Sequence, residues 1–280
     1  MELFIDILID AMLDSLKMLP FLFGAYLLME WLEHRSGEGM EKLLARARRL
    51  GPFTGALLGC VPQCGFSVAA ANLYAGRVIT MGTLVAVFLS TSDEAVPLLL
   101  GDPSRAGALL PLLGLKVAVG ALAGLAVDQV MARRPPREEG IHDLCHHCHC
   151  EEGSILWAAL RHTGSIFLFI LAVNLALGGG VALLGEERLA ALLLDGSLLQ
   201  PVAAALLGLI PNCAASVLLT RLYLAGAVSF GALAAGLLSA SGVGVLVLFR
   251  ANPRPRENLA VLGLVWGTGG AVGLILQLLG

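Results

Sequence analysis

The sequence predicts an all-α integral membrane protein made of two inverted-topology repeats, each with about three transmembrane helices plus a proline-broken re-entrant hairpin. Three observations support this fold class: the composition, the number of long apolar runs, and a repeat within the chain. Of the 280 residues, 57% are hydrophobic and only 14% are charged. Because soluble domains carry about a quarter charged residues, a large soluble helical domain is disfavoured.

The long apolar runs set the number of membrane segments. A helix needs roughly 20 apolar residues to span a bilayer. The 34 glycines also suit close helix packing in lipid, where no hydrophobic force drives helices together. The expected membrane-embedded segments lie near 3–32, 53–75, 78–100, 107–131, 155–179, 202–224, 228–249 and 259–279.

The chain matches itself after a shift of 149 residues, the distance from Gly59 to Gly208. Such a match indicates a duplicated unit. The aligned pairs include Pro52 with Pro201, Pro62 with Pro211, Cys64 with Cys213, Gly82 with Gly231, Ser90 with Ser239 and Ser92 with Ser241. We therefore expect a first membrane repeat at 1–131, a linker at 132–153 and a second membrane repeat at 154–280.

Basic residues predict how the halves are oriented. They gather at 42–49, at 133–137 and at 250–256. The positive-inside rule places these three stretches, and with them the linker, in the cytoplasm. Both termini then lie outside, and equivalent loops lie on opposite faces of the cytoplasmic (inner) membrane. The expected protein is thus multi-pass, with inverted halves.

Two of the segments have a proline in the middle. An even number of crossings between cytoplasmic stretches requires 53–75 to be a hairpin broken at Pro62, and 202–224 to be one broken at Pro211. Counting the hairpins once or twice gives 8–10 segments. A matched pair of interrupted segments points to the central site of a transporter, because irregular backbone at membrane depth needs surrounding protein or water. An ordinary pair of kinked helices is the alternative.

Charged residues inside the membrane are the strongest functional signal. Asp93 and Glu94 lie in the third segment, where the second repeat has Gly242 and Val243. A carboxylate at that depth costs at least about 2.5 kcal/mol, which argues for a function in one half only. Lys116 is expected to pair with one of these acids, either as a static ion pair or as a switch that a bound cation or proton releases.

Cysteines and amides surround the two prolines. Thiolates suit soft metals and metalloids, whereas carboxylates suit hard cations such as Mn²⁺. Simple apolar packing is the alternative for the cysteines. The predicted transport site comprises Asp93, Glu94, Cys64, Cys213, Gln63, Asn212, Pro62, Pro211, Ser90, Ser92 and Lys116, with Cys60 as a further metal ligand.

The linker has the composition of a metal-binding segment. Closely spaced thiolate and imidazole groups suit Zn²⁺ or Cu⁺, but the spacing is too crowded for a folded zinc finger. We expect a flexible metal collector or sensor; a biased linker without function is the alternative. Its candidate ligands are His142, Cys145, His146, His147, Cys148, His149 and Cys150.

Three stretches together resemble a known family. They are the Gly-x-x-Pro-x-Cys-Gly loop at Gly59–Gly65, the Thr-Ser-Asp-Glu-Ala-x-Pro stretch at Thr91–Pro97, and the His/Cys-rich centre that precedes Arg161-His162-Thr163. The family is labelled "putative heavy-metal exporters" or "putative manganese transporters" and is related to the arsenic permeases. The resemblance implies about ten membrane segments and efflux of a metal or metalloid.

The favoured function is a secondary transporter that exports a divalent metal or a metalloid, not an enzyme. Because no phosphate-binding Gly-x-x-x-x-Gly-Lys-[Ser/Thr] motif occurs, an ion or proton gradient is the expected energy source. No cofactor is expected besides a transported or regulatory metal ion, and the expected partners are the bilayer and that ion, not nucleic acid. A homo-oligomer is compatible with the sequence. Two alternatives are an organic-anion or oxyanion permease, and a membrane thiol-redox protein that uses Cys60 and Cys64.

Overall fold

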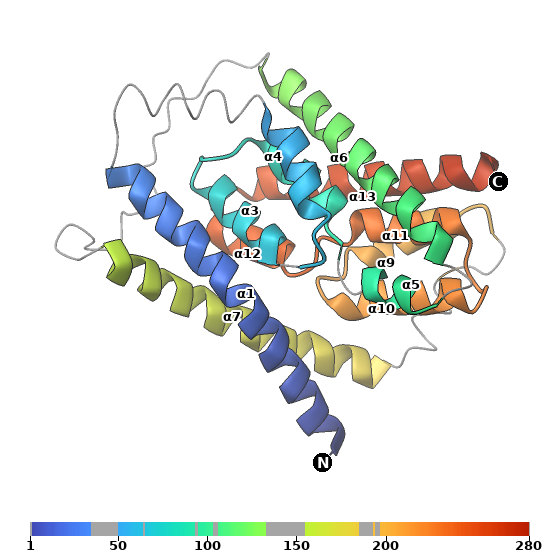
Figure 1. Ribbon diagram of the computed structural model, residues 1–280, viewed down its shortest axis with the longest axis horizontal. Coiled ribbons are helices and arrows are strands. Elements are labelled where there is room, and N and C mark those ends of the chain that lie inside the picture. The colour runs from blue at the N-terminus through green and yellow to red at the C-terminus, as the bar shows by residue number, and fades with distance from the viewer. Residues whose placement is uncertain are drawn as a thin grey trace.

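The computed structural model describes residues 2–34, 50–63, 65–92, 95–102, 106–132, 155–184, 193 and 197–279 (Figure 1). Every regular element in these ranges is a helix, so the all-α prediction is confirmed for the described part of the chain. The helices are α1 (Glu2–His34), an unlabelled helix Leu50–Gly59, α3 (Gly65–Ala75), α4 (Met81–Ser90), α5 (Ala95–Gly101), the short 3₁₀ helix η1 (Ala106–Ala108), α6 (Leu109–Ala132), α7 (Ile155–Leu184), α9 (Gln200–Gly208), α10 (Cys213–Leu224), α11 (Phe230–Ser239), α12 (Gly244–Ala251) and α13 (Pro255–Leu279).

The described helices suit a lipid environment. Four stretches are long and apolar enough to cross a membrane: Ala11–Leu28, Leu109–Ala132, Phe230–Ala251 and Pro255–Leu279. On α6, large apolar side chains such as Leu110 and Leu122 are exposed, which water would disfavour and lipid would not. The protein is therefore a multi-pass membrane protein.

Packing contacts recur in the two halves with the offset of 149 residues. In the first half, α6 crosses α4 where a Cβ on Gly124 would lie 2.5 Å from the carbonyl oxygen of Gly82. In the second half, α13 crosses α11 where a Cβ on Gly273 would lie 2.6 Å from the carbonyl oxygen of Gly231. Backbones approach this closely only where side chains are missing, which is how small residues hold membrane helices together.

The helix Leu50–Gly59 runs beside α4 in the same direction. Gly51, near its beginning, faces Thr83, and Gly59, at its end, faces Ser90. Each helix rises only about 15 Å, half of the roughly 30 Å hydrocarbon thickness. Because the two helices begin at the same level, the chain between them must return, so α3 runs back from the turn at Pro62 toward the level of Leu50.

The second half contains the same interrupted hairpin in α9 and α10. Gln63 donates its backbone N–H to the carbonyl of Val61 at 2.7 Å, and Asn212 donates to the carbonyl of Ile210 at 2.7 Å. The two proline-containing turns thus share this hydrogen bond across the proline.

Two further segments are interrupted where continuous helices were expected. The predicted segment 78–100 divides into α4 and α5, and the segment 228–249 divides into α11 and α12. At the first break the hydroxyls of Ser90 and Thr91 donate to the carbonyls of Ala86 and Val87 at 2.8 and 2.7 Å. These carbonyls also accept backbone N–H groups of the helix, so the hydroxyls bond back to its last turn instead of continuing the chain direction.

The helix that follows each break packs against the opposite half of the chain. In the second half, α12 packs on α3 of the first half, where Gly244 lies against Ser67. In the first half, α5 packs on α10 of the second half. The two apolar cores accordingly each contain residues from both halves of the chain, so the halves are intertwined rather than adjacent.

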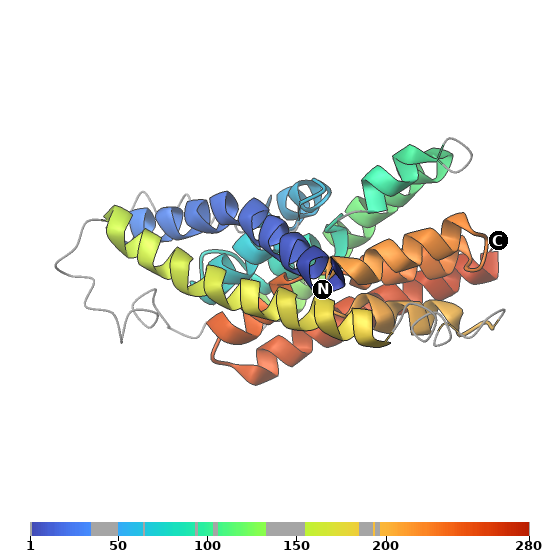
Figure 2. The same cartoon turned by 90° about the horizontal axis from the view of Figure 1, so that it is seen from below.

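Equivalent long helices run in opposite directions. In Figure 1 and Figure 2, α1 and α7 lie side by side and cross with opposite chain directions, and α6 and α13 also run opposite ways. A hydrogen bond from the Asn174 side chain to the Ser15 hydroxyl, at 3.3 Å, ties α7 to α1.

Candidate transport site

The first proline turn and the break after α4 lie side by side. Pro62 and Ser92 form an isolated parallel β-bridge, and the backbone N–H of Ser92 donates to the carbonyl of Gly59 at 3.1 Å. Both interruptions leave backbone N–H and C=O groups without helical hydrogen bonds. Pairing the two interruptions supplies hydrogen bonds to some of these groups. Three of the predicted site residues, Pro62, Ser90 and Ser92, are thereby brought to one place.

The hydroxyls of Ser90 and Ser92 bond to nearby backbone. Ser90 donates to the carbonyl of Ala86, and Ser92 donates to the carbonyl of Ser90 at 3.3 Å. Both side chains are buried. Since each hydroxyl uses only its proton in these bonds, its oxygen still has lone pairs that a cation or donor can use.

Lys116 lies on the buried face of α6, one turn from Leu112 and one turn from Gly120. Only 2% of the residue is exposed. Its Nζ donates to the carbonyl oxygen of Thr91 at 2.5 Å and to that of Leu237 at 2.8 Å. One ammonium therefore joins the break after α4 in the first half to the last turn of α11 in the second half.

These contacts offset the cost of placing a charge inside the membrane. A lysine at the centre of a helix costs about 2.5–3.5 kcal/mol on insertion scales. Hydrogen bonds to charged groups contribute about 1.5–3 kcal/mol each, and Lys116 makes two to backbone carbonyls. The C-terminal ends of α4 and α11 also carry partial negative charge that favours a cation.

The two amide residues beside the prolines have different partners. Gln63 donates from Nε2 to the carbonyl of Lys17 on α1 at 2.9 Å. Asn212 accepts the N–H of Ala214 at 2.9 Å and so caps the N-terminus of α10. Pro211 precedes this cap and is partly exposed. Gln63 thus contacts the first helix, whereas Asn212 orders the second hairpin.

Two of the candidate cysteines are within the described residues. Cys60 and Cys213 are half-buried, and the Cys60 sulfur lies 3.9 Å from the carbonyl oxygen of Leu113. Outside the described residues lie Cys64, Asp93, Glu94, His142, Cys145, His146, His147, Cys148, His149 and Cys150. Among the residues that are described, no three His, Cys, Asp or Glu side chains are placed to hold a metal ion. The pairing of Lys116 with Asp93 or Glu94 stays a prediction.

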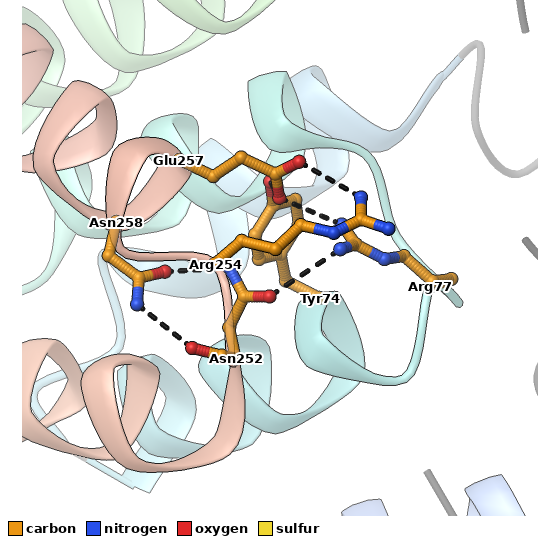
Figure 3. A network of polar contacts seen from close by, with 6 residues as sticks. All are labelled: Tyr74, Arg77, Asn252, Arg254, Glu257 and Asn258. Carbon is orange, nitrogen blue, oxygen red and sulfur yellow. Dashed lines mark hydrogen bonds and ion pairs between the residues drawn. The ribbon is translucent and has the colours of Figure 1, made fainter. Parts of the chain in front are cut away.

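Sequence analysis missed a polar network that joins the halves near the start of α13 (Figure 3). Glu257 accepts from Arg77 at 3.1 Å, from Tyr74 at 3.0 Å and from Arg254 at 3.1 Å. Arg77 also donates to the Asn252 side chain at 3.4 Å. The turn after α3 is in this way fastened to the connection between α12 and α13.

The repeat alignment marks Arg77 and Glu257 as residues of one half only, although it does not show that they pair. Positions 226 and 108, the equivalents of Arg77 and Glu257, hold Gly226 and Ala108. The other half lacks this charged pair, so the architecture common to both halves does not require it. The network therefore belongs, like Lys116, to the asymmetric features of the chain.

Asp128 is a second polar residue that sequence analysis missed. Its carboxylate accepts from the Thr80 hydroxyl at 2.7 Å and from the backbone N–H of Gly82 at 2.9 Å. It thereby fastens the end of α6 to the N-terminus of α4, where negative charge is stabilising. Gln277 is its equivalent in the second half and bonds to the Ser229 hydroxyl before α11.

Comparison with known proteins adds one match. A family model described as "Putative, 10TM heavy-metal exporter" matches residues 1–184 and 169–280, which together cover the whole chain. No curated protein and no solved structure matched. The described part of the chain supplies four helices long and apolar enough to cross a membrane, together with several shorter apolar helices.

Proposed function

Because the chain belongs to this family of heavy-metal exporters, we propose that it is a secondary transporter that moves a divalent metal cation, such as Mn²⁺ or a heavier metal, or a metalloid out of the cytoplasm. An ion or proton gradient drives the export. The observation that carries the proposal is the buried Lys116 ammonium, held at once by an interrupted helix of each half. Charge at such a meeting point is typical of transport pathways.

The two halves are inverted repeats in the inner membrane, with both termini outside. Support comes from the opposite directions of α6 and α13 and from the recurrence of their glycine contacts. The exchanged helices α5 and α12 connect each half to the core of the other. Movement of one half against the other would therefore open the centre to one side and close it to the other.

Asp93 and Glu94 bind the metal or exchange it for protons. The carbonyl that holds Lys116 belongs to Thr91, two residues before Asp93, so the ammonium and the acids share one region of the chain. A cation at the carboxylates would repel the ammonium and release it. Cys64 and Cys213, from the two proline turns, supply soft ligands if the substrate is a soft metal or metalloid.

The His/Cys-rich linker collects metal on the cytoplasmic side. Its seven candidate ligands lie within 142–150 and precede the second repeat. Metal capture on the cytoplasmic side suits an exporter, since it raises the local metal concentration where the metal enters the transport site.

Transport into inverted vesicles tests the proposal. Native protein, Asp93→Asn and a chain lacking 142–152 are compared for uptake of Mn²⁺, Zn²⁺, Cd²⁺, Cu⁺ and arsenite under an imposed proton gradient. We expect gradient-dependent uptake of at least one ion by native protein, at least a tenfold loss in Asp93→Asn, and reduced uptake at low metal concentration without the linker. Absence of uptake for every ion would contradict the proposal.

An anion permease is the second candidate, because the centre contains the Lys116 ammonium and because α3 and α10 begin at the proline turns. Positive helix N-termini attract anions. Asp93→Asn separates the two functions, since removing a negative charge should preserve or improve anion transport. A thiol-redox function would instead show Cys60 and Cys64 becoming alkylated only after reduction.

A further inference from the structure

We infer that the junction of α4 and α11 is a binding site for a monovalent cation, and that the ammonium of Lys116 is the cation that fills it. As an explanation of transport, this inference rests on the proposed function and adds detail to it. The existence of the site rests only on the contacts of Lys116.

The two carbonyls that hold the ammonium stand where helices end. Ser241 donates its N–H to the carbonyl of Ser239 at 2.9 Å, so it does not continue the helical ladder to Leu237. The carbonyl of Thr91 follows the last residue of α4, and the Ser92 N–H is bonded to Gly59. Both carbonyls are therefore turned to Lys116 rather than to a following turn of helix.

The helix ends are one reason why a cation suits this junction. Each helix C-terminus carries about half a negative charge, which a nearby ammonium stabilises. The position equivalent to Lys116 on α13 is Val265, which is buried and apolar. One cation thus serves both halves.

Carbonyl oxygens at helix ends are also the ligands with which broken transporter helices hold coupling ions such as Na⁺. In this protein the position is taken by a side chain, so the native centre needs no free monovalent ion. Removing the side chain should convert the junction into a site for an external one. Lys116→Ala removes three carbons and the ammonium, which n-propylammonium replaces atom for atom.

Thermal unfolding of the purified protein in detergent tests the site without any transport. Native protein, Lys116→Ala and Val265→Ala are each measured in choline, Na⁺ and n-propylammonium chloride at equal ionic strength. We expect Lys116→Ala to have a lower Tm than native protein in choline and to regain at least half of the difference in n-propylammonium or Na⁺. Native protein and Val265→Ala should show no such dependence on the cation.

Two further variants keep the test decisive if Lys116→Ala does not fold. Lys116→Met fills the space without charge and should have a low Tm in every salt. Lys116→Gln keeps a hydrogen-bond donor without charge and should also be destabilised. A native Tm for Lys116→Gln in choline, or no response of Lys116→Ala to any cation, would overturn the inference.

Flux measurements separate this inference from the proposed function. If native vesicles transport no metal but the Tm of Lys116→Ala follows the cation, the proposed function fails and the site stands. If native vesicles transport metal and the Tm of Lys116→Ala does not respond to any cation, the inferred site fails and the proposed function stands. With both correct, metal flux by Lys116→Ala requires added Na⁺ or n-propylammonium, whereas native flux does not.

Discussion

Arg77 adopts the same left-handed backbone conformation as Gly226, its counterpart 149 residues later, with φ of 58° against 77°. Glycine reaches this region freely, whereas a residue with a side chain is strained there by about 1 kcal/mol or more. Arg77 is nevertheless retained in the turn, where it pairs with Glu257 and Asn252 of the other half.

The Arg77–Glu257 pair should therefore show coupling in a double-mutant cycle. Arg77→Gly relieves the backbone strain but removes the ion pair, so we expect a small net change in unfolding free energy. Glu257→Gln should cost about 0.5–2 kcal/mol in native protein, because the network is partly buried, and clearly less in the Arg77→Gly background. Unfolding in mixed detergents measures both costs. Equal costs in the two backgrounds would show that the pair contributes nothing.

The glycine contacts between helices predict that glycine-to-alanine substitutions will destabilise the protein at contact positions but not at control positions. Gly124→Ala and Gly273→Ala place a methyl group against the carbonyls of Gly82 and Gly231, and each should destabilise the protein by about 1–3 kcal/mol. Gly114→Ala and Gly263→Ala serve as controls.

Those two controls lie on the same helices, α6 and α13, but nothing stands within 4 Å of an added Cβ. They should be neutral or slightly stabilising, since alanine favours helix over glycine. Circular dichroism melts in detergent measure all four. Similar losses at contact and control positions would contradict the packing described for these helices.

Asp128 should stabilise the start of α4 through its charge as well as its hydrogen bonds. Asp128→Ala removes both acceptors at Thr80 and Gly82 and should cost about 1–2 kcal/mol. Asp128→Asn keeps one of the two acceptor oxygens and should cost about half as much, although it loses one hydrogen bond and the negative charge at the helix N-terminus. Hydrogen exchange at the amides of 81–84 reports the effect locally. Unchanged exchange in Asp128→Ala would contradict the assigned role.

Ser239 and Ser90 occupy equivalent positions but should respond differently to alanine. The Ser90 hydroxyl bonds to its own helix, whereas the buried Ser239 hydroxyl has no hydrogen-bond partner among the described residues. We expect Ser90→Ala to cost about 1 kcal/mol and Ser239→Ala to be neutral or stabilising. Melting temperatures decide this. A loss of stability in Ser239→Ala would show that its hydroxyl has a partner.

The hairpins and the helical class follow from the sequence because local chemistry determines them. Pro62 and Pro211 each remove a helical hydrogen bond, and their equivalence in the repeat alignment predicted a break at both positions. The breaks after α4 and α11 were missed because the helices on either side of each break are apolar enough to read as one continuous span. At the first break, Ser90 and Thr91 bond back to the last turn of α4.

The environment of Lys116 was only partly predictable. Burial of the ammonium and its need for acceptors follow from its place in an apolar segment. The carbonyl of Leu237 does not, because it lies 121 residues away and in the other repeat. Aligning a repeat with itself reveals equivalent positions but not the contacts between halves. The Arg77–Glu257 network was missed for the same reason, since its members are 180 residues apart.

The central claim is that the two halves enter the membrane in opposite orientations. Val78 and Ala227 are equivalent residues in the turns after α3 and α10, so Val78→Cys and Ala227→Cys report the two sides directly. Cells and inverted vesicles are treated with a membrane-impermeant maleimide, and labelled peptides are identified by mass spectrometry. The account predicts that position 78 is labelled only from the cytoplasmic side and position 227 only from the outer side. Labelling of both positions from the same side would contradict it.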